Sequence, residues 1–450
     1  MKKYLYVPIE IKKREYPAKI LFALAASLRG YQVVVGKSTI VEKLMKVMPR
    51  GVYLGTSIVK QHRDIFLKLK AAGHQVVAID EEGLVYYNKD NFVKFRIDTE
   101  TIQSIDAFIA WGKHHLELVR EKGDFPNVYQ VGNVRFEMLK PKYKYLYERE
   151  EKVLQQKYGQ YILFNTNLAA YNHFSGKKEY LKSLNSLVKL DNPDNSFYND
   201  KIDHQKNTME SYLRLVKKLA ERNPNLNIVV RPHPSEKIDT WREVEGGNVF
   251  IVQEGNVIPW ISSALCVIQQ NCTTAIEAHY LGTDTISYLP CYDERFDSGL
   301  PNQVTKVCHT EEEVFELITK KLEQQSIYTS DEKQAIIDKL NHYIANMDEG
   351  ASSIQELIRV LDQVTIPSNH QGMPIRWTKL YMAIRESLSL MLNKQKRSNA
   401  SYVKQKFDEL NETELSDLID RTNANFRSKY DHVSVTKLYD DAYLFVGRDS

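Results

Sequence analysis

The stretch Val267-Ile268-Gln269-Gln270-Asn271-Cys272-Thr273-Thr274-Ala275-Ile276-Glu277-Ala278 opens with a short apolar run and passes through small hydroxyl residues into a helical pattern. A strand followed directly by a helix is the repeating unit of a mostly parallel sheet. Working outward, we expect further strands at 227–230, 249–253 and 285–289, and helices at 209–222, 257–264 and 274–281. This part of the chain therefore predicts an α/β domain.

The same alternation fills the first third of the chain. Apolar runs are found at 4–9, 32–36, 52–55, 75–80, 107–111 and 128–132, and helical patterns at 18–29, 38–48 and 60–71. Because 450 residues exceed what one hydrophobic core supports, we expect two Rossmann-like domains, 1–145 and 146–365. The second would begin with the strand 161–167, after a helix at 145–156. Helices are expected at 311–324, 331–345, 352–364 and 377–393, with residues 366–450 forming a helical tail that ends in a β-hairpin at 433–446.

The composition excludes several classes of protein. A total of 61 Lys and Arg against 58 Asp and Glu leaves a formal charge of +3, which is too balanced for a dedicated nucleic-acid binder. No run approaches the roughly 20 apolar residues of a membrane span, and Pro8 and Glu10 interrupt the N-terminal run, so no signal peptide is expected. None of the four cysteines stands in a CxxC pair, and we expect buried free thiols in a reducing cytosol. The protein is expected to be cytoplasmic.

Residues that follow the strands are the ones to inspect, because ligands of open parallel sheets lie beyond the carboxyl ends of the strands. The strand at 227–230 leads into Arg231, His233, Pro234 and Ser235. An arginine and a histidine together suit a phosphate group, and two prolines stiffen the turn between them. The alternative is a structural turn that contains a satisfied histidine.

A second group follows the strand near residue 270. Thr273 and Thr274 open a helix after Asn271, and helix N-termini favour anions; ordinary N-capping by threonine is the alternative. Glu277, one turn later, would bind a ribose or cap its own helix. Two asparagines that end the strand 161–167 add amides, unless they only form a turn. The expected nucleotide-sugar-binding residues are Arg231, His233, Pro234, Ser235, Asn271, Thr273, Thr274, Glu277, Asn165 and Asn167.

The third group is acidic: Asp80, Glu81 and Glu82 precede Gly83 at the end of an apolar run in the first domain. A positioned carboxylate takes a proton from an acceptor hydroxyl or attacks an anomeric carbon, and close like charges raise one pKa toward the working range. A solvated acidic turn is the alternative. A carboxylate facing a donor phosphate site across two domains is what group transfer requires.

Arg231-Pro232-His233-Pro234 and the run Asn271 to Ala278 together resemble the donor half of a GT-B glycosyltransferase. More narrowly, the chain is similar to bacterial surface-polysaccharide biosynthesis proteins related to capsule Kdo transferases, and distantly to bacterial sialyltransferases. The similarity covers roughly residues 1–365, and in the first domain it depends on Asp80 to Gly83. It implies a CMP-activated ulosonic acid donor of the Kdo, sialic, legionaminic or pseudaminic type. His233-Pro234 and Thr273-Thr274 would contact the CMP, the latter in place of the Ser-Ser pair of relatives.

The reaction implied by this resemblance transfers the sugar to a glycan or glycolipid acceptor without a cofactor. Phosphate-binding side chains would stabilise the charge that develops as the anomeric bond breaks. Glu82, followed by Glu81 and Asp80, is the expected catalytic carboxylate, acting as a base or as a nucleophile with opposite stereochemical outcomes. No Asp-x-Asp stands in a metal-holding position, and Asp293 and Asp297 have the wrong spacing, so we expect no metal.

Two other functions fit the same pattern. UDP-sugar 2-epimerases share the two-domain layout and need no acceptor. A non-catalytic protein of a surface-glycan assembly complex would use its tail as a contact, and Lys396, Arg397 and Lys404 would then dock on an anionic inner leaflet, although a solvated face is the alternative. The polar insert 170–205 shows no clear periodicity, and we expect a loop that distinguishes donor sugars.

Overall fold

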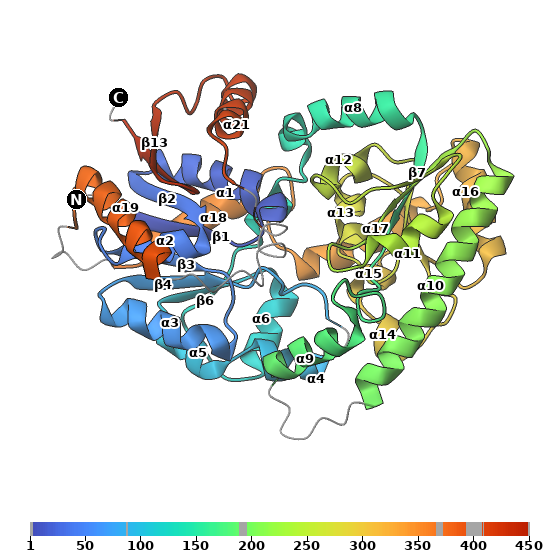
Figure 1. The fold of residues 1–450 in the computed structure, drawn as a ribbon, viewed down its shortest axis with the longest axis horizontal. Coiled ribbons are helices and arrows are strands. Elements are labelled where there is room, and N and C mark those ends of the chain that lie inside the picture. The colour runs from blue at the N-terminus through green and yellow to red at the C-terminus, as the bar shows by residue number, and fades with distance from the viewer. Residues whose placement is uncertain are drawn as a thin grey trace. The chain divides into compact units, whose positions relative to one another are not determined.

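The computed structural model describes residues 3–86, 89–188, 196–365, 372–392, 407 and 409–448. The chain divides into two compact units, each with its own sheet (Figure 1). Unit 1 comprises Met1–Gly83, Asn91–Leu146 and Asn341–Ser450, and unit 2 comprises Leu84–Asp90 and Tyr147–Leu340. The predicted α/β class with two Rossmann-like sheets is confirmed.

The sheet of unit 1 has the strand order β13-β14-β2-β1-β3-β4-β5-β6. Neighbours among β1 to β6 are parallel, and the chain order reverses between β1 and β3. The inner strands are buried along nearly their whole length, which explains their continuous apolar sequences. The bounds are β1 Lys3–Ile9, β2 Tyr31–Lys37, β3 Gly51–Gly55, β4 Gln75–Ile79, β5 Ala107–Ala110, β6 Val128–Gln130, β13 Val433–Tyr439 and β14 Ala442–Gly447.

Helices connect these strands and return the chain to unit 1 after unit 2 is complete. They are α1 Lys12–Ser27, α2 Ser38–Met45, α3 Lys60–Ala71, α4 Lys89–Arg96, α5 Thr99–Ser104, α6 Lys113–Arg120, α7 Val134–Glu137, a 3-10 helix at Pro141–Leu146, α18 Ser353–Gln363, α19 Ile375–Leu392 and α21 Glu412–Asn425. The short helices α4 to α7 were not expected from the sequence. They follow charged, weakly periodic segments that give little signal.

The C-terminal segment is part of unit 1, which corrects the expected division at residues 365 and 366. The predicted hairpin exists, with its turn at Asp440-Asp441, but β14 pairs antiparallel with β2 and so extends the first sheet. Gly36 permits this pairing, because a Cβ atom there would lie 2.3 Å from the carbonyl oxygen of Asp441. Lys396, Arg397 and Lys404, the expected membrane contact, lie outside the described residues.

The sheet of unit 2 has the order β12-β11-β10-β7-β8-β9, and its neighbouring strands are all parallel. The first strand, β7, lies in the middle, with β8 and β9 on one side and the later strands on the other. The chain order therefore reverses between β7 and β10. The bounds are β7 Tyr161–Asn165, β8 Asn227–Arg231, β9 Val249–Ile251, β10 Cys266–Gln269, β11 Thr285–Tyr288 and β12 Lys306–Cys308.

The helices of unit 2 include two in the segment expected to be an irregular loop. They are α8 Glu148–Tyr158, α9 Gly176–Val188, α10 Ser196–Arg222, α11 Ile238–Trp241, a 3-10 helix at Arg242–Val244, α12 Val257–Ser262, α13 Thr274–Tyr280, α14 Glu294–Asp297, α15 Leu300–Gln303, α16 Glu311–Leu322 and α17 Ser330–Tyr343, whose residues from Asn341 onward belong to unit 1. The prediction of a loop at 170–205 was therefore wrong for most of its length. One reason is that polar residues of α10 are buried: Gln205 accepts hydrogen bonds from Ala170 N (2.8 Å) and Tyr171 N (3.3 Å).

Two further expectations concern burial. Cys266 and Cys308 are buried, whereas Cys272 and Cys291 are partly exposed, so the expectation of buried thiols holds for two of the four. Within the described part of the chain, the helices all fall short of the length and apolar character needed to span a membrane.

Candidate functional site

The carboxyl end of the unit 2 sheet collects the loops that follow its central strands. Strand β7 lies between β10 and β8, and the order of strands reverses between β7 and β10. Doubly wound sheets bind their ligands at such a switch point. The residues selected from the sequence in this unit lie at the ends of these three strands or after them.

Glu236, a buried residue that was not selected from the sequence, ties two of these loops together. Its Oε1 accepts hydrogen bonds from Thr166 Oγ1 (2.7 Å), Leu168 N (3.0 Å) and His233 N (3.2 Å). Its Oε2 accepts one from Trp241 Nε1 at 3.0 Å. The only sign of Glu236 in the sequence was its position three residues after His233. Sequence alone does not distinguish a buried glutamate that accepts hydrogen bonds from neutral donors from a glutamate on the surface.

His233 lies on the exposed side of this scaffold. Its Nδ1 accepts a hydrogen bond from Ser235 N at 3.1 Å, and its carbonyl oxygen accepts one from Gln253 Nε2 at 2.9 Å. With Nδ1 accepting, the neutral imidazole carries its hydrogen on Nε2, which makes that nitrogen a donor. Pro234 is exposed and Ser235 is partly buried.

The guanidinium group of Arg231 binds main-chain oxygens of the loop after β9. Its Nη1 donates to the carbonyl oxygen of Glu254 at 2.6 Å and its Nη2 to that of Gly255 at 3.3 Å. The guanidinium carbon lies 4.8 Å from the ring centroid of Trp260. Burial lowers the pKa of Arg231 to about 10. Both terminal nitrogens of Arg231 therefore stabilise the turn after β9. This geometry favours a structural role for Arg231 over the expected contact with a phosphate.

Asn271 is a scaffold residue of the turn after β10. It adopts φ 49°, in the left-handed region that asparagine tolerates better than most residues. Its Nδ2 donates to Phe296 O (2.7 Å) and to Asp297 Oδ1 (2.9 Å), and its Oδ1 accepts from Asn302 Nδ2 (2.7 Å). The turn is therefore fixed by side chains that come from much later in the chain.

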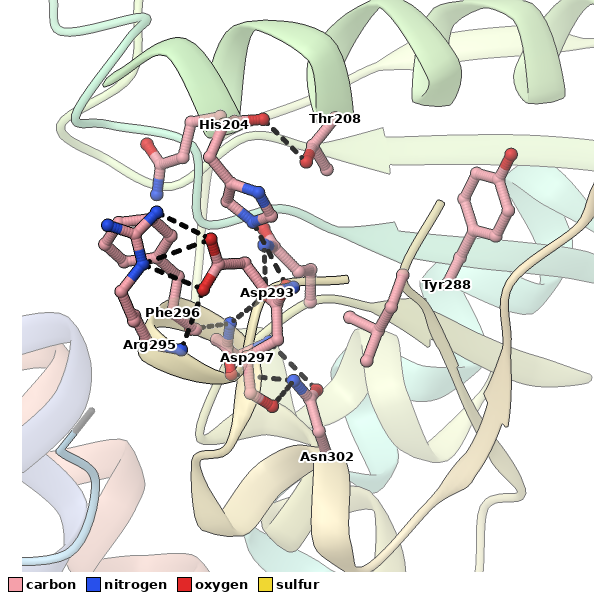
Figure 2. Close-up of polar contacts among 12 residues, drawn as sticks. His204, Thr208, Tyr288, Asp293, Arg295, Phe296, Asp297 and Asn302 are labelled. Carbon is pink, nitrogen blue, oxygen red and sulfur yellow. Dashed lines mark hydrogen bonds and ion pairs between the residues drawn. The ribbon is translucent and has the colours of Figure 1, made fainter. Parts of the chain in front are cut away.

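Asp297 is the centre of this support, which Figure 2 shows together with His204 and Asn302. Its Oδ2 lies 3.1 Å from His204 Nε2. Its Oδ1 also accepts a hydrogen bond from Gln270 Nε2 at 3.0 Å. We call Asp297, Asn302, Asn271, Gln270 and His204 the Asp297 cluster. Asp297, excluded as a metal ligand on spacing, is thus occupied with internal contacts.

The remaining residues of the nucleotide prediction lie around this turn. Asn167 Nδ2 donates to Asn271 O at 3.0 Å, which ties the loop after β7 to the loop after β10. Thr273 stands at the N-cap of α13 but makes no capping hydrogen bond, so simple capping does not explain it. Asn165 is buried, and its Nδ2 has no hydrogen-bond partner among the described residues. Thr274 and Glu277 are buried in α13.

In unit 1 the three acidic residues after β4 have different surroundings. Asp80 is fully buried and forms an ion pair with Arg96; burial raises the pKa of Asp80, and Arg96 opposes that effect. Glu82 is exposed, and its Oε2 lies 3.2 Å from Arg96 Nη1. Glu81 is nearly buried, with its Oε1 at 3.5 Å from Lys19 Nζ. The structure therefore separates three residues that the sequence could not distinguish.

The second carboxylate oxygen of Glu81 is buried and has no hydrogen-bond partner among the described residues. Glu81 lines a small cavity together with Glu15, Lys19, Asn133 and Arg135. Asn133 Nδ2 is likewise buried without a partner in the described part of the chain. The space open to water centres is about 20 Å³, enough for about one water molecule or hydroxyl group. An acceptor and a donor thus border a cavity of matching size.

The floor of this cavity carries a buried ion pair on α1. Glu15 Oε2 lies 2.7 Å from Lys19 Nζ. Burial acts to raise the pKa of Glu15, but Lys19 and Arg14 outweigh it and hold that pKa below its ordinary value. Burial acts to lower the pKa of Lys19, but Glu15 and Glu81 outweigh it and raise that pKa. The lysine therefore stays charged beside Glu81.

His115 lies beneath the acidic turn, where a Cβ atom on Gly83 would approach its ring to 2.8 Å. Burial lowers its pKa to about 3, with smaller contributions from His114 and Arg96. The unfolded chain binds this proton near pH 6.5, so stability is lost as the pH falls from about 6.5 toward 3, by up to ~1.4 kcal/mol per pH unit. Urea unfolding at pH 7.5, 6.5 and 5.5 measures the loss.

The matched control for this prediction is His115→Asn, which keeps a side-chain acceptor but does not titrate. We expect a shallower fall of unfolding free energy below pH 6.5 in this variant. His432→Ala, at an exposed histidine, should retain the slope of the parent protein. Equal slopes in the parent and in His115→Asn would contradict the assignment.

The sequence matches no protein-family model and no curated protein. Solved structures with partial similarity include the UDP-GlcNAc 2-epimerase of Methanocaldococcus jannaschii in complex with UDP-GlcNAc and UDP (13% identity, TM-score 0.48, covering 81% of this chain and 100% of that one). Others are UDP-GlcNAc 2-epimerase from Neisseria meningitidis (13%, TM-score 0.47, 81% and 100%) and the wall teichoic acid polymerase TagF (9%, TM-score 0.45, 80% and 88%).

Proposed function

We propose that this protein is a metal-independent glycosyltransferase that moves an ulosonic acid from a CMP-activated donor to a surface-glycan acceptor. The observation that carries the proposal is a buried hydrogen-bond donor at the switch point of unit 2, Asn165 Nδ2, which has no partner among the described residues. The loops after the neighbouring strands add the Thr273 hydroxyl, which makes no capping hydrogen bond, and the exposed side chain of His233. Donors on a pre-ordered scaffold at this edge suit a nucleotide phosphate. The preference for CMP is supported by the resemblance of His233-Pro234 and Thr273-Thr274 to the CMP-contacting motifs of capsule Kdo transferases and their relatives.

In the proposed reaction the bond between the anomeric carbon and the CMP phosphate breaks, and CMP leaves with the bonding electrons. The donors of unit 2 stabilise the charge that appears on the phosphate. An acceptor hydroxyl forms the new bond to the anomeric carbon. In the base-catalysed form of the reaction its proton passes to a carboxylate. In the alternative the carboxylate displaces CMP at the anomeric carbon, and the acceptor hydroxyl then displaces the carboxylate, which takes the proton.

We assign the carboxylate to Glu81, although the sequence favoured Glu82. Asp80 is paired with Arg96 and fully buried, and Glu82 is exposed and shares the same arginine. Glu81 has one oxygen near Lys19 and the other without a hydrogen-bond partner in the described residues, and the residue lines a cavity of hydroxyl size. A general base must reach the proton it takes. Its neighbour Asn133 would orient the hydroxyl from the donor side.

Calorimetric titration of the purified protein with CMP, UDP and GDP tests the proposal. We expect CMP to bind most tightly, and His233→Ala to weaken CMP binding by about tenfold or more, because one hydrogen bond to a charged group is lost. His432→Ala is the matched control, since it removes another exposed histidine. Thr273→Val, which removes a hydroxyl at nearly constant volume, should weaken CMP binding in the same direction.

The other outcomes point to different functions. Preference for UDP would replace the CMP proposal by a UDP-sugar 2-epimerase or a hexosyltransferase. Absence of binding to all three nucleotides would favour a non-catalytic protein of glycan assembly. CMP binding that is equally strong in His233→Ala and Thr273→Val would place the nucleotide elsewhere.

A further inference from the structure

Two histidines and a glutamate lie together on unit 1, away from the residues assigned to transfer. His114 and Glu117 belong to α6, and His342 is the residue before the last of α17. One ligand atom from each of the three lies within 4.8 Å of the other two. His342 Nε2 and Glu117 Oε2 are 3.2 Å apart. All three are partly or fully exposed, so solvent ions reach them.

The backbone around these side chains is held independently of any ion. Ala345 N donates to Trp111 O at 2.7 Å, which fixes the segment after α17 against the start of α6. A Cβ atom on Gly112 would lie 2.4 Å from the carbonyl oxygen of Tyr343, so only glycine permits this approach. The ring centroids of His114 and Tyr343 are 4.3 Å apart. The three side chains are therefore presented from two elements whose backbones are locked together.

Two imidazoles and one carboxylate form a ligand set typical of Zn²⁺ sites that keep a fourth position for water. An ion pair is a weaker explanation of the cluster. It uses Glu117 and one imidazole, and Glu117 is also 3.9 Å from Lys113 Nζ. The side chains of His342 and Glu117 are 38% and 46% exposed, and pairs this exposed contribute little to stability.

We propose that His114, Glu117 and His342 bind one divalent transition-metal ion of the Zn²⁺ type, with water as the fourth ligand. Bonds to Zn²⁺ are roughly 2.0–2.2 Å long, so binding requires the three side chains to rotate until their ligand atoms, now within 4.8 Å of one another, surround one ion. The chain enters unit 1 from unit 2 at Asn341, directly before His342. The ion would thus fasten the last residues of α17 to α6 within unit 1. It plays no part in the proposed transfer reaction.

The test uses the full-length protein, stripped with EDTA and then desalted. Calorimetric titration with ZnCl2 is expected to show one ion per chain, and Co²⁺ in its place should give the visible absorption bands of a four-coordinate site. His342→Ala and Glu117→Gln should each weaken Zn²⁺ binding by at least about tenfold. Loss of a residue that only hydrogen-bonds to a metal ligand already costs about tenfold in metal affinity, and loss of a ligand should cost at least as much. His432→Ala, at an exposed histidine outside the cluster, should bind like the parent protein.

Thermal melting of the metal-free variants checks their folding, and these melting temperatures should match that of the metal-free parent. Zn²⁺ should raise the melting temperature of the parent and of His432→Ala, but not of the double variant His114→Ala/His342→Ala. Absence of Zn²⁺ binding to the parent would overturn the proposal. Unchanged binding in the double variant would also overturn it, because the ion would then be held by other residues such as the cysteines.

Discussion

The Glu81→Gln variant is expected to lose turnover by about 10²–10⁴-fold, the usual contribution of a general base, while its affinity for CMP stays unchanged. The amide keeps the size of the side chain and removes the ability to take a proton. Glu81 is nearly buried and lines a cavity of about 20 Å³. Because glutamine has nearly the same shape as glutamate, the expected loss of turnover comes from the missing negative charge. Release of CMP from CMP-N-acetylneuraminic acid and CMP-Kdo measures kcat, and calorimetry measures CMP binding.

Glu82→Gln is the matched control, since it makes the same chemical change on the adjacent exposed residue. Its turnover should stay within a few-fold of the parent value. Loss of activity in Glu82→Gln with retention in Glu81→Gln would return the role to the residue that the sequence favoured. Asp80→Asn is expected to affect stability first, because it leaves the Arg96 guanidinium without its buried partner.

The second large effect is expected from Asn302→Leu. Asn302 Oδ1 accepts hydrogen bonds from Asn271 N (3.2 Å) and Ser287 Oγ (3.0 Å), and its Nδ2 donates to Asn271 Oδ1 (2.7 Å). Leucine matches the volume but leaves several buried polar groups unpaired, at about 1–3 kcal/mol each. We expect a loss of roughly 3–5 kcal/mol in the stability of unit 2 and weaker CMP binding, measured by urea unfolding and calorimetry.

Gln303→Ala provides the comparison for this variant. Gln303 is the next residue of α15 and is exposed, so its replacement should change the unfolding free energy by less than about 0.5 kcal/mol. If Asn302→Leu unfolds like the parent and binds CMP normally, the Asp297 cluster does not hold the turn at Asn271.

The sequence predicted the two sheets well because parallel strands are buried on both faces and appear as continuous apolar runs. The strands beginning at Asn227 and Thr285 were found within one residue of their expected ends. The segment 170–205 was missed because α10 buries polar side chains such as Gln205 against a loop. The C-terminal hairpin was recognised, but its partner β2 is a contact of very long range that no local pattern reveals.

The candidate site was predictable only as a set of loops. Position after a strand drew attention to His233 and to the acidic turn, because the carboxyl ends of parallel strands meet at one edge. It could not show that Arg231 is engaged by the carbonyl oxygens of Glu254 and Gly255. Nor could it show which of three consecutive acids faces a cavity, since that depends on the direction in which the chain leaves the sheet.

The pairing of β14 with β2 also governs what happens while the chain is being synthesised. Val33 of β2 pairs with Phe445 of β14, so the edge of the first sheet is translated long before the strand that covers it. At synthesis rates of roughly 5–20 residues per second, about 20–80 s pass between the synthesis of β2 and that of β14. An uncovered strand edge recruits other chains. The edge of β2 is therefore open to aggregation from its own synthesis until β14 has left the ribosome, and removing the hairpin would make that exposure permanent.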